Sequence, residues 1–297
     1  MMDNSQSGGT VPHETSNHAL RDAVWMLGED RDGILGWARR QIECWVPKLT
    51  GSQARFGDRL GSGLSIVCGT AERNASVKRA LEQGVLDMTE LGDDDFILEQ
   101  TILESKPVLM IAGRTVRAAV YGICGLFERL GCTFLISGDR LPPLEPTLEV
   151  PVLNEIEHTD SSWRGIWFGG YCFVANAMFS LPDYEAMFDQ MIKLKMNRIV
   201  FYHFSQEPFI DYTFKGERKL VGDISHPDSG YISYGREFTG SWLVKDLPVG
   251  REKFDREKLC PPEFQDIKSS AEALDTAKAF MRKIMVMARE REIGVWT

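Results

Sequence analysis

Short apolar runs and helical stripes alternate along the first part of the chain. The runs Ala23–Leu27 and Leu64–Cys68 are short and apolar, and they predict two buried strands. Between them apolar side chains recur at helical spacing from Ile34 to Val46, and Gly51 supplies the expected end of that helix. A strand, a helix and a second strand in this order indicate an α/β unit.

The next elements predict a hairpin followed by a helix. Phe96–Leu103 alternates as a strand, Pro107–Ala112 is a second run, and Glu104–Lys106 makes the turn between them. Cys132–Ile136 is expected to return to the same sheet after the helix. We interpret the small residues of that helix as the side that lies close on the sheet: Ala118, Ala119, Gly122 and Gly125.

Two features of this domain resemble binding sites, and we interpret neither as one. The run Asp93-Asp94-Asp95 is interpreted as a solvated turn before a strand. Gly113 stands ahead of a helix, where an anion can bind, but neither G-x-G-x-x-G nor G-K-[ST] is present there. A nucleotide-binding, doubly wound protein is therefore disfavoured.

The second half of the chain opens with a strand, a helix and a strand. Trp163–Phe168 predicts a short strand, and Ser180–Asp183 is a helix-start signal. Apolar side chains recur at helical spacing from Tyr184 to Leu194, and Asn197 is expected to adopt the left-handed conformation that ends the helix. Arg198–Phe204 is apolar on both faces, which is typical of a parallel strand covered by helices.

A long segment without clear periodicity precedes the last elements. Ser205–Pro262 is rich in Gly, Pro and aromatic residues and is expected to be an inserted loop. A helix then begins near Ser269, and Ile293–Thr297 opens a further strand. This order opens either a doubly wound sheet or a (β/α)8 TIM barrel, and a barrel needs about 250 residues. We therefore expect an α/β sandwich domain over residues 21–150, followed at 160–297 by the first strands of a barrel, apparently truncated.

Composition and charge narrow the class of protein. The 297 residues are 43% hydrophobic and 26% charged, as in an ordinary soluble globular protein, and the net charge is −9. This acidity argues against nucleic acid or an anionic membrane surface as a partner. Residues 1–20 are expected to be a disordered lead without a signal peptide, so a cytoplasmic protein is expected, with secretion left open if the true start lies upstream.

The six cysteines form no CxxC pair and no zinc-ligand spacing with histidine. Cys44, Cys68 and Cys124 stand in apolar runs and are expected to be buried as small hydrophobic residues. An even number leaves a disulfide open. No cofactor and no metal are expected.

Several of these segments resemble two families of glycoside hydrolases. KLTG (Lys48–Gly51), IVCGT (Ile66–Thr70) and FILE…PVLMIAGRTVRAAVYGICGLFERLGC (Phe96–Cys132) resemble the N-terminal α/β domain that precedes the barrel in family 67 α-glucuronidases and family 20 β-N-acetylhexosaminidases. WRGIWF (Trp163–Phe168) resembles the first barrel strand, and YEAMFDQMIKLKMNRIVFYHF (Tyr184–Phe204) resembles the helix and strand that follow it.

The resemblance implies roles for residues near the strand ends. In the hexosaminidase group an arginine of the first strand contacts sugar hydroxyls, and this role falls on Arg164, although Gly169 stands where that group has an aspartate. In the glucuronidase group polar residues end the second strand, and Tyr202, His203 and Ser205 would occupy those positions. Their residue types differ from that pattern, which leaves the sugar open.

Strand geometry constrains these substrate-binding candidates. Arg164 lies at the beginning of its strand, whereas barrel enzymes place their sites at the carboxyl ends, so the alternative for Arg164 is a salt bridge at the domain junction. Tyr202 and His203 point to opposite sides of their strand, and at most one faces the barrel axis. His203 is either a substrate contact or a structural histidine. Glu207 follows in the loop as a further candidate.

Together these observations predict the N-terminal portion of a glycoside hydrolase that acts on O-glycosidic bonds of oligosaccharides or polysaccharides. Such hydrolysis needs two carboxyl groups, which are expected beyond residue 297, so the chain alone should be inactive. The alternative is a non-catalytic carbohydrate-binding or assembly module. Its loop aromatics would either stack on sugar rings or form the loop's own core: Tyr212, Phe214, Tyr231, Tyr234, Phe238 and Trp242. The oligomeric state is left open.

Overall fold

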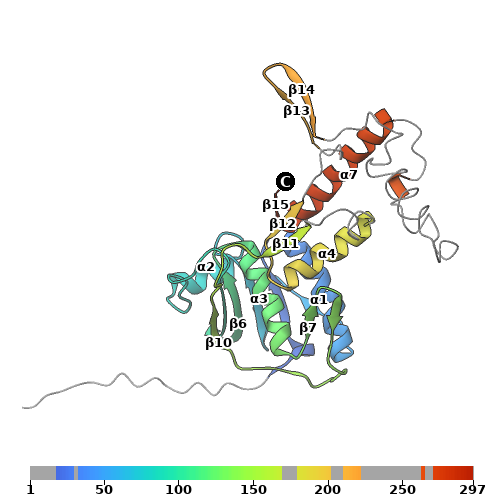
Figure 1. Cartoon of the computed structure of the whole chain (residues 1–297). Helices are drawn as coiled ribbons and strands as arrows, with labels where there is room; N and C mark the ends of the chain where they lie inside the picture. The colour runs from blue at the N-terminus through green and yellow to red at the C-terminus, as the bar shows by residue number, and fades with distance from the viewer. Residues whose placement is uncertain are drawn as a thin grey trace, which may run out of the picture.

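The computed structural model describes residues 18–29, 33–168, 179–201, 210–221, 262–264 and 270–296. These residues form an N-terminal α/β domain and a second unit of parallel strands with covering helices (Figure 1). The expected fold class is therefore confirmed at the level of an α/β domain followed by a strand–helix repeat.

A six-stranded mixed sheet forms the centre of the N-terminal domain. Its four neighbouring strands β6, β4, β2 and β3 are parallel, and β5 and β10 extend one edge in antiparallel orientation. The strands in spatial order are β10 (Asn154–Glu157), β5 (Phe96–Leu103), β6 (Lys106–Gly113), β4 (Ser65–Gly69), β2 (Val24–Leu27) and β3 (Arg55–Phe56). The sheet thus extends past the boundary expected at residue 150.

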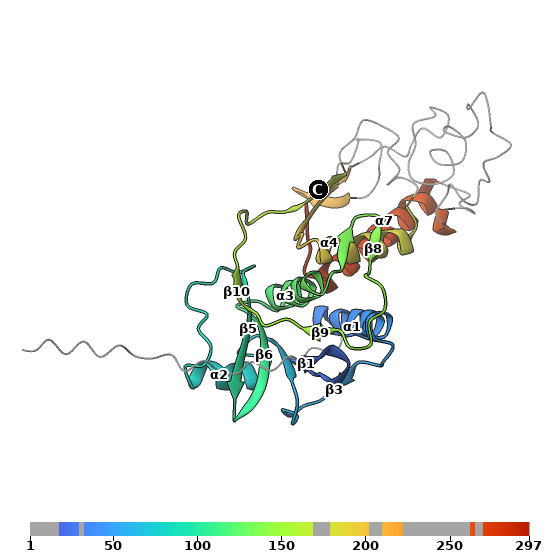
Figure 2. The same cartoon turned by 90° about the horizontal axis from the view of Figure 1, so that it is seen from below.

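Helices cover both faces of this sheet. α1 (Ile34–Thr50) and α3 (Val116–Arg129) lie side by side on one face, and α2 (Ala75–Glu82) lies on the other (Figure 2). Gly51 ends α1 in the left-handed conformation, as expected. The larger core, between the sheet and α1 and α3, is dominated by aromatic side chains that are fully buried: Trp25, Trp45, Tyr121 and Phe127.

Glycine lets α3 lie close on the sheet, which confirms the interpretation of its small residues. A Cβ atom added to Gly122 would lie 2.6 Å from Cγ2 of Ile111 and 3.2 Å from the ring of Phe96. A Cβ atom added to Gly125 would lie 3.0 Å from the same ring. Thr115 caps the helix through a hydrogen bond that its hydroxyl accepts from the N–H of Ala118.

Two expectations for this domain have opposite outcomes. The hairpin of β5 and β6 is confirmed, and its two turn residues Glu104 and Ser105 adopt φ values of 52° and 61°. The expected return of Cys132–Ile136 to the sheet is wrong. β7 (Thr133–Leu135) pairs instead with β8 (Gly138–Arg140) in a separate hairpin, because β10 occupies the sheet edge beside β5.

In the second unit three parallel strands lie in sequence order. β11 (Gly165–Phe168) pairs with β12 (Arg198–Phe201), which pairs with β15 (Gly294–Trp296). The crossover helices α4 (Leu181–Lys193) and α7 (Ser270–Glu290) pack against each other, so they cover the same face. The expected strand–helix–strand unit is confirmed.

Details of this unit differ from expectation at two places. Ser180 and Asp183 form the expected capping box of α4. The left-handed residue after α4 is Lys195, with φ 59°, and not Asn197. The segment expected to be a loop without regular structure contains a hairpin of β13 (Ile210–Phe214) and β14 (Glu217–Val221).

Minor elements complete the described part of the chain. β1 (His18–Ala19) pairs with β9 (Glu149–Val150), and short 3-10 helices cover Leu20–Asp22 and Pro262–Phe264. Cys68 and Cys124 are buried as expected, whereas Cys44 is exposed, which corrects that expectation. No helix within the described residues is both long and apolar enough to span a membrane.

We predict that Gly122→Ala lowers the free energy of unfolding by about 1–3 kcal/mol, because the added methyl group overpacks the contact with Ile111 and Phe96. This loss should exceed the helix-propensity gain of about 1 kcal/mol that alanine brings. Gly63→Ala is the control, since an added Cβ atom there meets nothing within 4 Å. Urea unfolding of both variants checks the prediction, which a neutral or stabilising Gly122→Ala would contradict.

Candidate functional site

The two ends of the parallel strands β11, β12 and β15 differ in what the structure describes. The candidates Tyr202, His203, Ser205 and Glu207 follow the carboxyl end of β12, and they lie outside the described residues. Arg164 directly precedes β11 at the opposite, amino end. Among these candidates only Arg164 lies within the described residues, and its contacts are described below.

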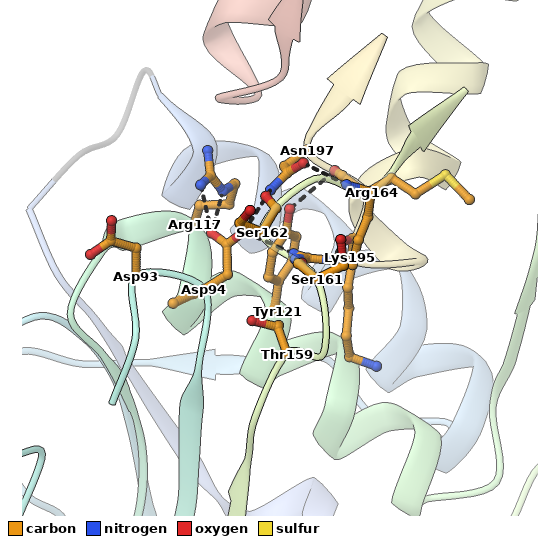
Figure 3. A network of polar contacts seen from close by, with 12 residues as sticks. Asp93, Asp94, Arg117, Tyr121, Thr159, Ser161, Ser162, Arg164, Lys195 and Asn197 are labelled. Carbon is orange, nitrogen blue, oxygen red and sulfur yellow. Dashed lines mark hydrogen bonds and ion pairs between the residues drawn. The ribbon is translucent and has the colours of Figure 1, made fainter. Parts of the chain in front are cut away.

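Asp94 joins Arg164 to the N-terminal domain. Arg164 donates from Nη2 to Oδ2 of Asp94 over 2.9 Å, and Nδ2 of Asn197 donates to the same oxygen over 2.6 Å. Arg117, in the first turn of α3, donates to Oδ1 from Nε and Nη2 over 2.8 and 2.5 Å. Figure 3 shows the carboxylate between Arg117 and Asn197. Both oxygens of Asp94 are thus paired.

Asp94 and its partner Arg117 contact residues at or near the start of each of the three parallel strands. Arg164 stands before β11 and Asn197 before β12. Nη1 of Arg117 donates to the carbonyl of Glu292, two residues before β15, over 3.0 Å. The N–H of Asn197 donates to the carbonyl of Arg164, and the N–H of Gly294 donates to the carbonyl of Asn197. The Asp94 carboxylate therefore binds the residues before β11 and β12 directly, and it is linked to the residues before β15 through Arg117.

This arrangement corrects the interpretation of Asp93-Asp94-Asp95 as a solvated turn. Asp94 and Asp95 are only 5% and 7% exposed. Burial by itself would raise the pKa of Asp94, but the hydrogen bonds and charge of Arg117, followed by Arg164 and Asn197, lower it below its usual value. Asp94 is therefore held as an anion at neutral pH.

Asp95 has a separate set of partners. Its carboxylate accepts hydrogen bonds from the N–H of Gly92 and from the N–H and hydroxyl of Thr159, and it lies 2.9 Å from Nδ1 of His158. Burial opposes ionisation, but the bonds from Gly92, His158 and Thr159 outweigh it and lower the pKa of Asp95 to about 2. Asp95 thus fastens the strand connection after β10 to the turn before β5.

All three nitrogen atoms of the Arg164 guanidinium have partners. Besides Asp94, Nε donates to the carbonyl of Lys195 over 2.7 Å, and Nη1 donates to the carbonyl of Ser161. The alternative expected from strand geometry, a salt bridge at the domain junction, is present. The sugar contact that the family resemblance implies for Arg164 stays a prediction.

Two further carboxylates connect the units away from Asp94. Asp139 in β8 receives Nζ of Lys193 at 2.8 Å and Nε1 of Trp45 at 3.0 Å. Asp189 in α4 receives Nε1 of Trp37 at 2.8 Å and Nε of Arg291 at 2.7 Å. Between these pairs, one hydrophobic core runs from the N-terminal domain into α4 and α7. The junction therefore combines a continuous hydrophobic core with several ion pairs.

The strand face turned away from α4 and α7 carries tryptophan. Ile199 is fully buried toward the helices, so its neighbours along β12 face the other way. In the strand register Trp167 and Trp296 flank Val200, and the two tryptophans are 65% and 45% exposed. Trp163 contacts Trp296 edge to face, with ring centroids 4.1 Å apart. This face is aromatic and open to solvent over the described residues.

The usual ligand crevice of a doubly wound sheet is closed in the N-terminal domain. It would lie between the carboxyl ends of β2 and β4, whose following helices cover opposite faces. There Nδ2 of Asn74 donates to the carbonyls of Met26 and Cys68, and the N–H of Gly28 donates to Cys68. Among the described residues no group of three His, Cys, Asp or Glu side chains is placed to hold a metal.

Comparison with known proteins agrees with this fold. Residues 11–126 match the family model of the glycosyl hydrolase family 67 N-terminus. The N-terminal domain is therefore similar to that of family 67. This confirms the resemblance expected from the segments Lys48–Gly51, Ile66–Thr70 and Phe96–Cys132. No curated protein matches the chain in sequence.

One solved glycosidase structure resembles the fold of this chain beyond the N-terminal domain as well. A GH20 β-N-acetylhexosaminidase from Streptomyces coelicolor A3(2) covers 94% of this chain and 42% of its own, at 13% identity and a TM-score of 0.50. A mutant β-hexosaminidase of Streptomyces plicatus gives 12% identity, the same coverages and a TM-score of 0.47. A family GH115 4-O-methyl-α-glucuronidase covers 62% of this chain and 25% of its own, at 15% identity and a TM-score of 0.42. The chain spans less than half the length of these enzymes.

Sequence reasoning missed Asp94, Arg117 and Asn197 as the centre of the junction. Asp94 and Asn197 lie 103 positions apart, and no local periodicity connects them. One signal was present, because a polar residue stands directly before each of the strands that begin at Gly165 and Arg198. An amide or guanidinium side chain directly before a strand is a candidate partner for a carboxylate from a distant part of the chain.

We predict that Asp94→Asn lowers the free energy of unfolding by about 3 kcal/mol, because it leaves the partly buried guanidinium groups of Arg117 and Arg164 without a counter-charge. The control is Asp93→Asn, the exposed neighbour, which should stay within about 0.5 kcal/mol of the unchanged chain. Denaturant unfolding measures both. Equal stabilities of the two variants would show that the Asp94 pairs contribute nothing net.

We predict that acid lowers the free energy of unfolding through protonation of Asp95. Its folded pKa of about 2 lies below the unfolded value, so its contribution is complete above about pH 5 and is lost as the pH falls toward 2. The loss should reach about 2 kcal/mol. Asp95→Asn should flatten the fall in unfolding free energy between these pH values, whereas Asp93→Asn should leave it steep. Identical pH profiles for Asp95→Asn and the unchanged chain would disprove this.

Proposed function

We propose that this chain is the N-terminal portion of a glycoside hydrolase. It would combine a family 67-like α/β domain with the first three strands of a (β/α)8 catalytic barrel that cleaves O-glycosidic bonds in oligosaccharides or polysaccharides. The observation that carries the proposal is the sequential order of β11, β12 and β15, with α4 and α7 on one face. Such single winding, repeated, closes a sheet into a barrel, whereas double winding leaves it open.

The orientation of the junction supports a substrate site at the carboxyl ends of these strands. Asp94 and Arg117 fasten the amino ends to the N-terminal domain, so that domain lies at the end of the strands opposite the edge where barrel enzymes hold their substrates. Tyr202, His203, Ser205 and Glu207 follow β12 at the carboxyl edge and are our candidates for substrate contacts. For Arg164 we propose a positioning role at the amino end.

The chemistry would need two carboxyl groups, one acting as acid and the other as nucleophile or base. We propose that strands following residue 297 in the whole protein supply them, in agreement with the 42% of the hexosaminidase that this chain spans. A glucuronidase and a hexosaminidase are both compatible with the proposed fold. No cofactor enters the proposed reaction.

The proposal predicts that the whole protein hydrolyses aryl glycosides and that residues 1–297 alone do not. A panel of 4-nitrophenyl glycosides and of glucuronate-bearing xylo-oligosaccharides measures both. In the whole protein His203→Ala should lower kcat/KM about tenfold or more, the loss expected for a hydrogen bond to a substrate hydroxyl.

Two variants are the controls for this measurement. Asp93→Asn, an exposed change in the other domain, should keep kcat/KM unchanged. Arg164→Lys should lower the Tm and keep kcat/KM of the folded enzyme. A whole protein that binds sugars without any hydrolysis would overturn the proposal in favour of a carbohydrate-binding module, and a large fall of kcat/KM in Arg164→Lys would restore the sugar contact.

A further inference from the structure

Arg198, the first residue of β12, is a half-buried cation without a counter-charge. Its Nη1 donates to the backbone carbonyl of Asn197 over 2.9 Å, but within the described residues its guanidinium forms no ion pair. The other described arginines that are buried or half-buried each pair with a carboxylate: Arg117, Arg129, Arg164 and Arg291. Removing a charge from water is costly unless an opposite charge accompanies it, so Arg198 is an exception that calls for a partner.

The guanidinium of Arg198 lies across β15, on the face turned away from α4 and α7. A Cβ atom added to Gly294 would lie 2.5 Å from Nη1 and 2.9 Å from Cζ of Arg198, so glycine makes room for the guanidinium there. Cζ also lies 5.8 Å from the ring centroid of Trp163. Nε is buried and unpaired, whereas Nη2 is unpaired but not buried. Nη2 is therefore the nitrogen that a partner from outside the described residues can reach.

A pocket of about 560 Å³ opens beside this guanidinium, where β15 meets the end of α7. Met285 and Arg289 of α7 line it together with residues 292–295 and Arg198. Arg289 is exposed, and its guanidinium has no partner among the described residues. Glu292 contributes the single carboxylate of the lining, against two guanidinium groups. The pocket is therefore net positive, and it fits an acidic group.

The same pocket lies at an open edge of the strand layer. β15 is the last strand of the order β11-β12-β15, and within the described residues it pairs with β12 alone. An edge strand presents free N–H and C=O groups on which another strand can pair. In a singly wound barrel the next strand is added beside the last one. The start of that strand would lie beside the pocket, because the pocket includes the first residue of β15.

The location of the pocket favours a carboxylate that is carried by a strand over a free anion. A free anion would lose its translational freedom to bind in an open pocket, where it would also face Glu292. A carboxylate on a strand that pairs with β15 is already positioned by backbone hydrogen bonds. Its binding therefore costs little further entropy.

We propose that the strand that follows β15 in the whole protein carries an aspartate or glutamate near its start, and that this carboxylate accepts a hydrogen bond from Nη2 of Arg198 and pairs with Arg289. The inference rests on the proposed barrel and adds a third acidic group to it. The two catalytic carboxyl groups would act at the carboxyl ends of the strands, whereas this carboxylate would lie at the amino ends. Its role would be to fix the register of the next strand.

The test measures the Tm of Arg198→Met in the 297-residue chain and in the whole protein at about pH 7. In the 297-residue chain the change removes an unpaired charge, so the Tm should stay within about 1 °C or rise. In the whole protein it leaves a buried carboxylate without its partner, so the Tm should fall by about 5 °C or more. Arg40→Met, an exposed change on α1, is the control and should shift neither Tm by more than about 1 °C.

The pH dependence of this difference identifies the partner as a carboxylate. Pairing with Arg198 would lower the pKa of the acid, so its stabilising contribution would be complete at neutral pH and lost as the pH falls. The difference in Tm between the whole protein and its Arg198→Met variant should therefore shrink toward about pH 3. If Arg198→Met does not fold, Gly294→Ala replaces it, because the added Cβ atom displaces the guanidinium. Its Tm loss should be larger in the whole protein than in the 297-residue chain.

Three results would overturn the proposal. The first is an equal change of Tm in the two chains. The second is a difference in Tm that persists unchanged at about pH 3, because a carboxylate takes up a proton there. The third is a rise in the Tm of the 297-residue chain with sodium phosphate, but not with sodium chloride of equal ionic strength, that Arg198→Met abolishes, which would assign the pocket to a free anion.

Hydrolysis is measured separately, so the two proposals fail in different ways. A whole protein that shows the loss of Tm but no hydrolysis would keep the Arg198 pair and lose the catalytic function. A whole protein that hydrolyses glycosides but shows no loss of Tm would keep the function and lose the pair.

Discussion

The buried carboxylate of Asp94 is the constraint on which the joining of the two units depends. A charge that is 5% exposed is tolerated only when it is paired, and Asp94 uses both oxygens to bind Arg117, Arg164 and Asn197. Two of these partners enter parallel strands, and the third also holds the carbonyl before the last strand. This set of bonds fixes the amino ends of the strand layer against the N-terminal domain.

The two ends of the parallel strands have different surroundings. The amino ends of β11, β12 and β15 are fixed at the junction, which is supported by Asp139 and Asp189 and by a continuous hydrophobic core. The carboxyl ends lie at the other edge of the layer. A barrel built on these strands would therefore keep its catalytic edge clear of the N-terminal domain, so that domain would support the barrel without covering its substrate site.

The carboxyl ends of the strands in the N-terminal sheet are closed by hydrogen bonds. The N-terminal sheet is doubly wound, but Asn74 and the Gly28 N–H close the crevice between β2 and β4 with backbone hydrogen bonds. A pocket lies one strand further along, beside β3, which is only two residues long.

The sequence by itself determined the local elements and the family resemblance. Apolar periodicity located α1, α3, α4 and the central strands, the Ser180–Asp183 signal marked the start of α4, and glycine in α3 indicated its close approach to the sheet. These features depend on neighbours within a few positions, which a linear pattern records. Tertiary structure alone decided that Asp94 is a buried junction anion, that Lys195 and not Asn197 is left-handed, and that Cys132–Ile136 leaves the sheet. Each of these depends on partners from distant parts of the chain, and a pairing across 103 positions leaves no periodic trace in the sequence.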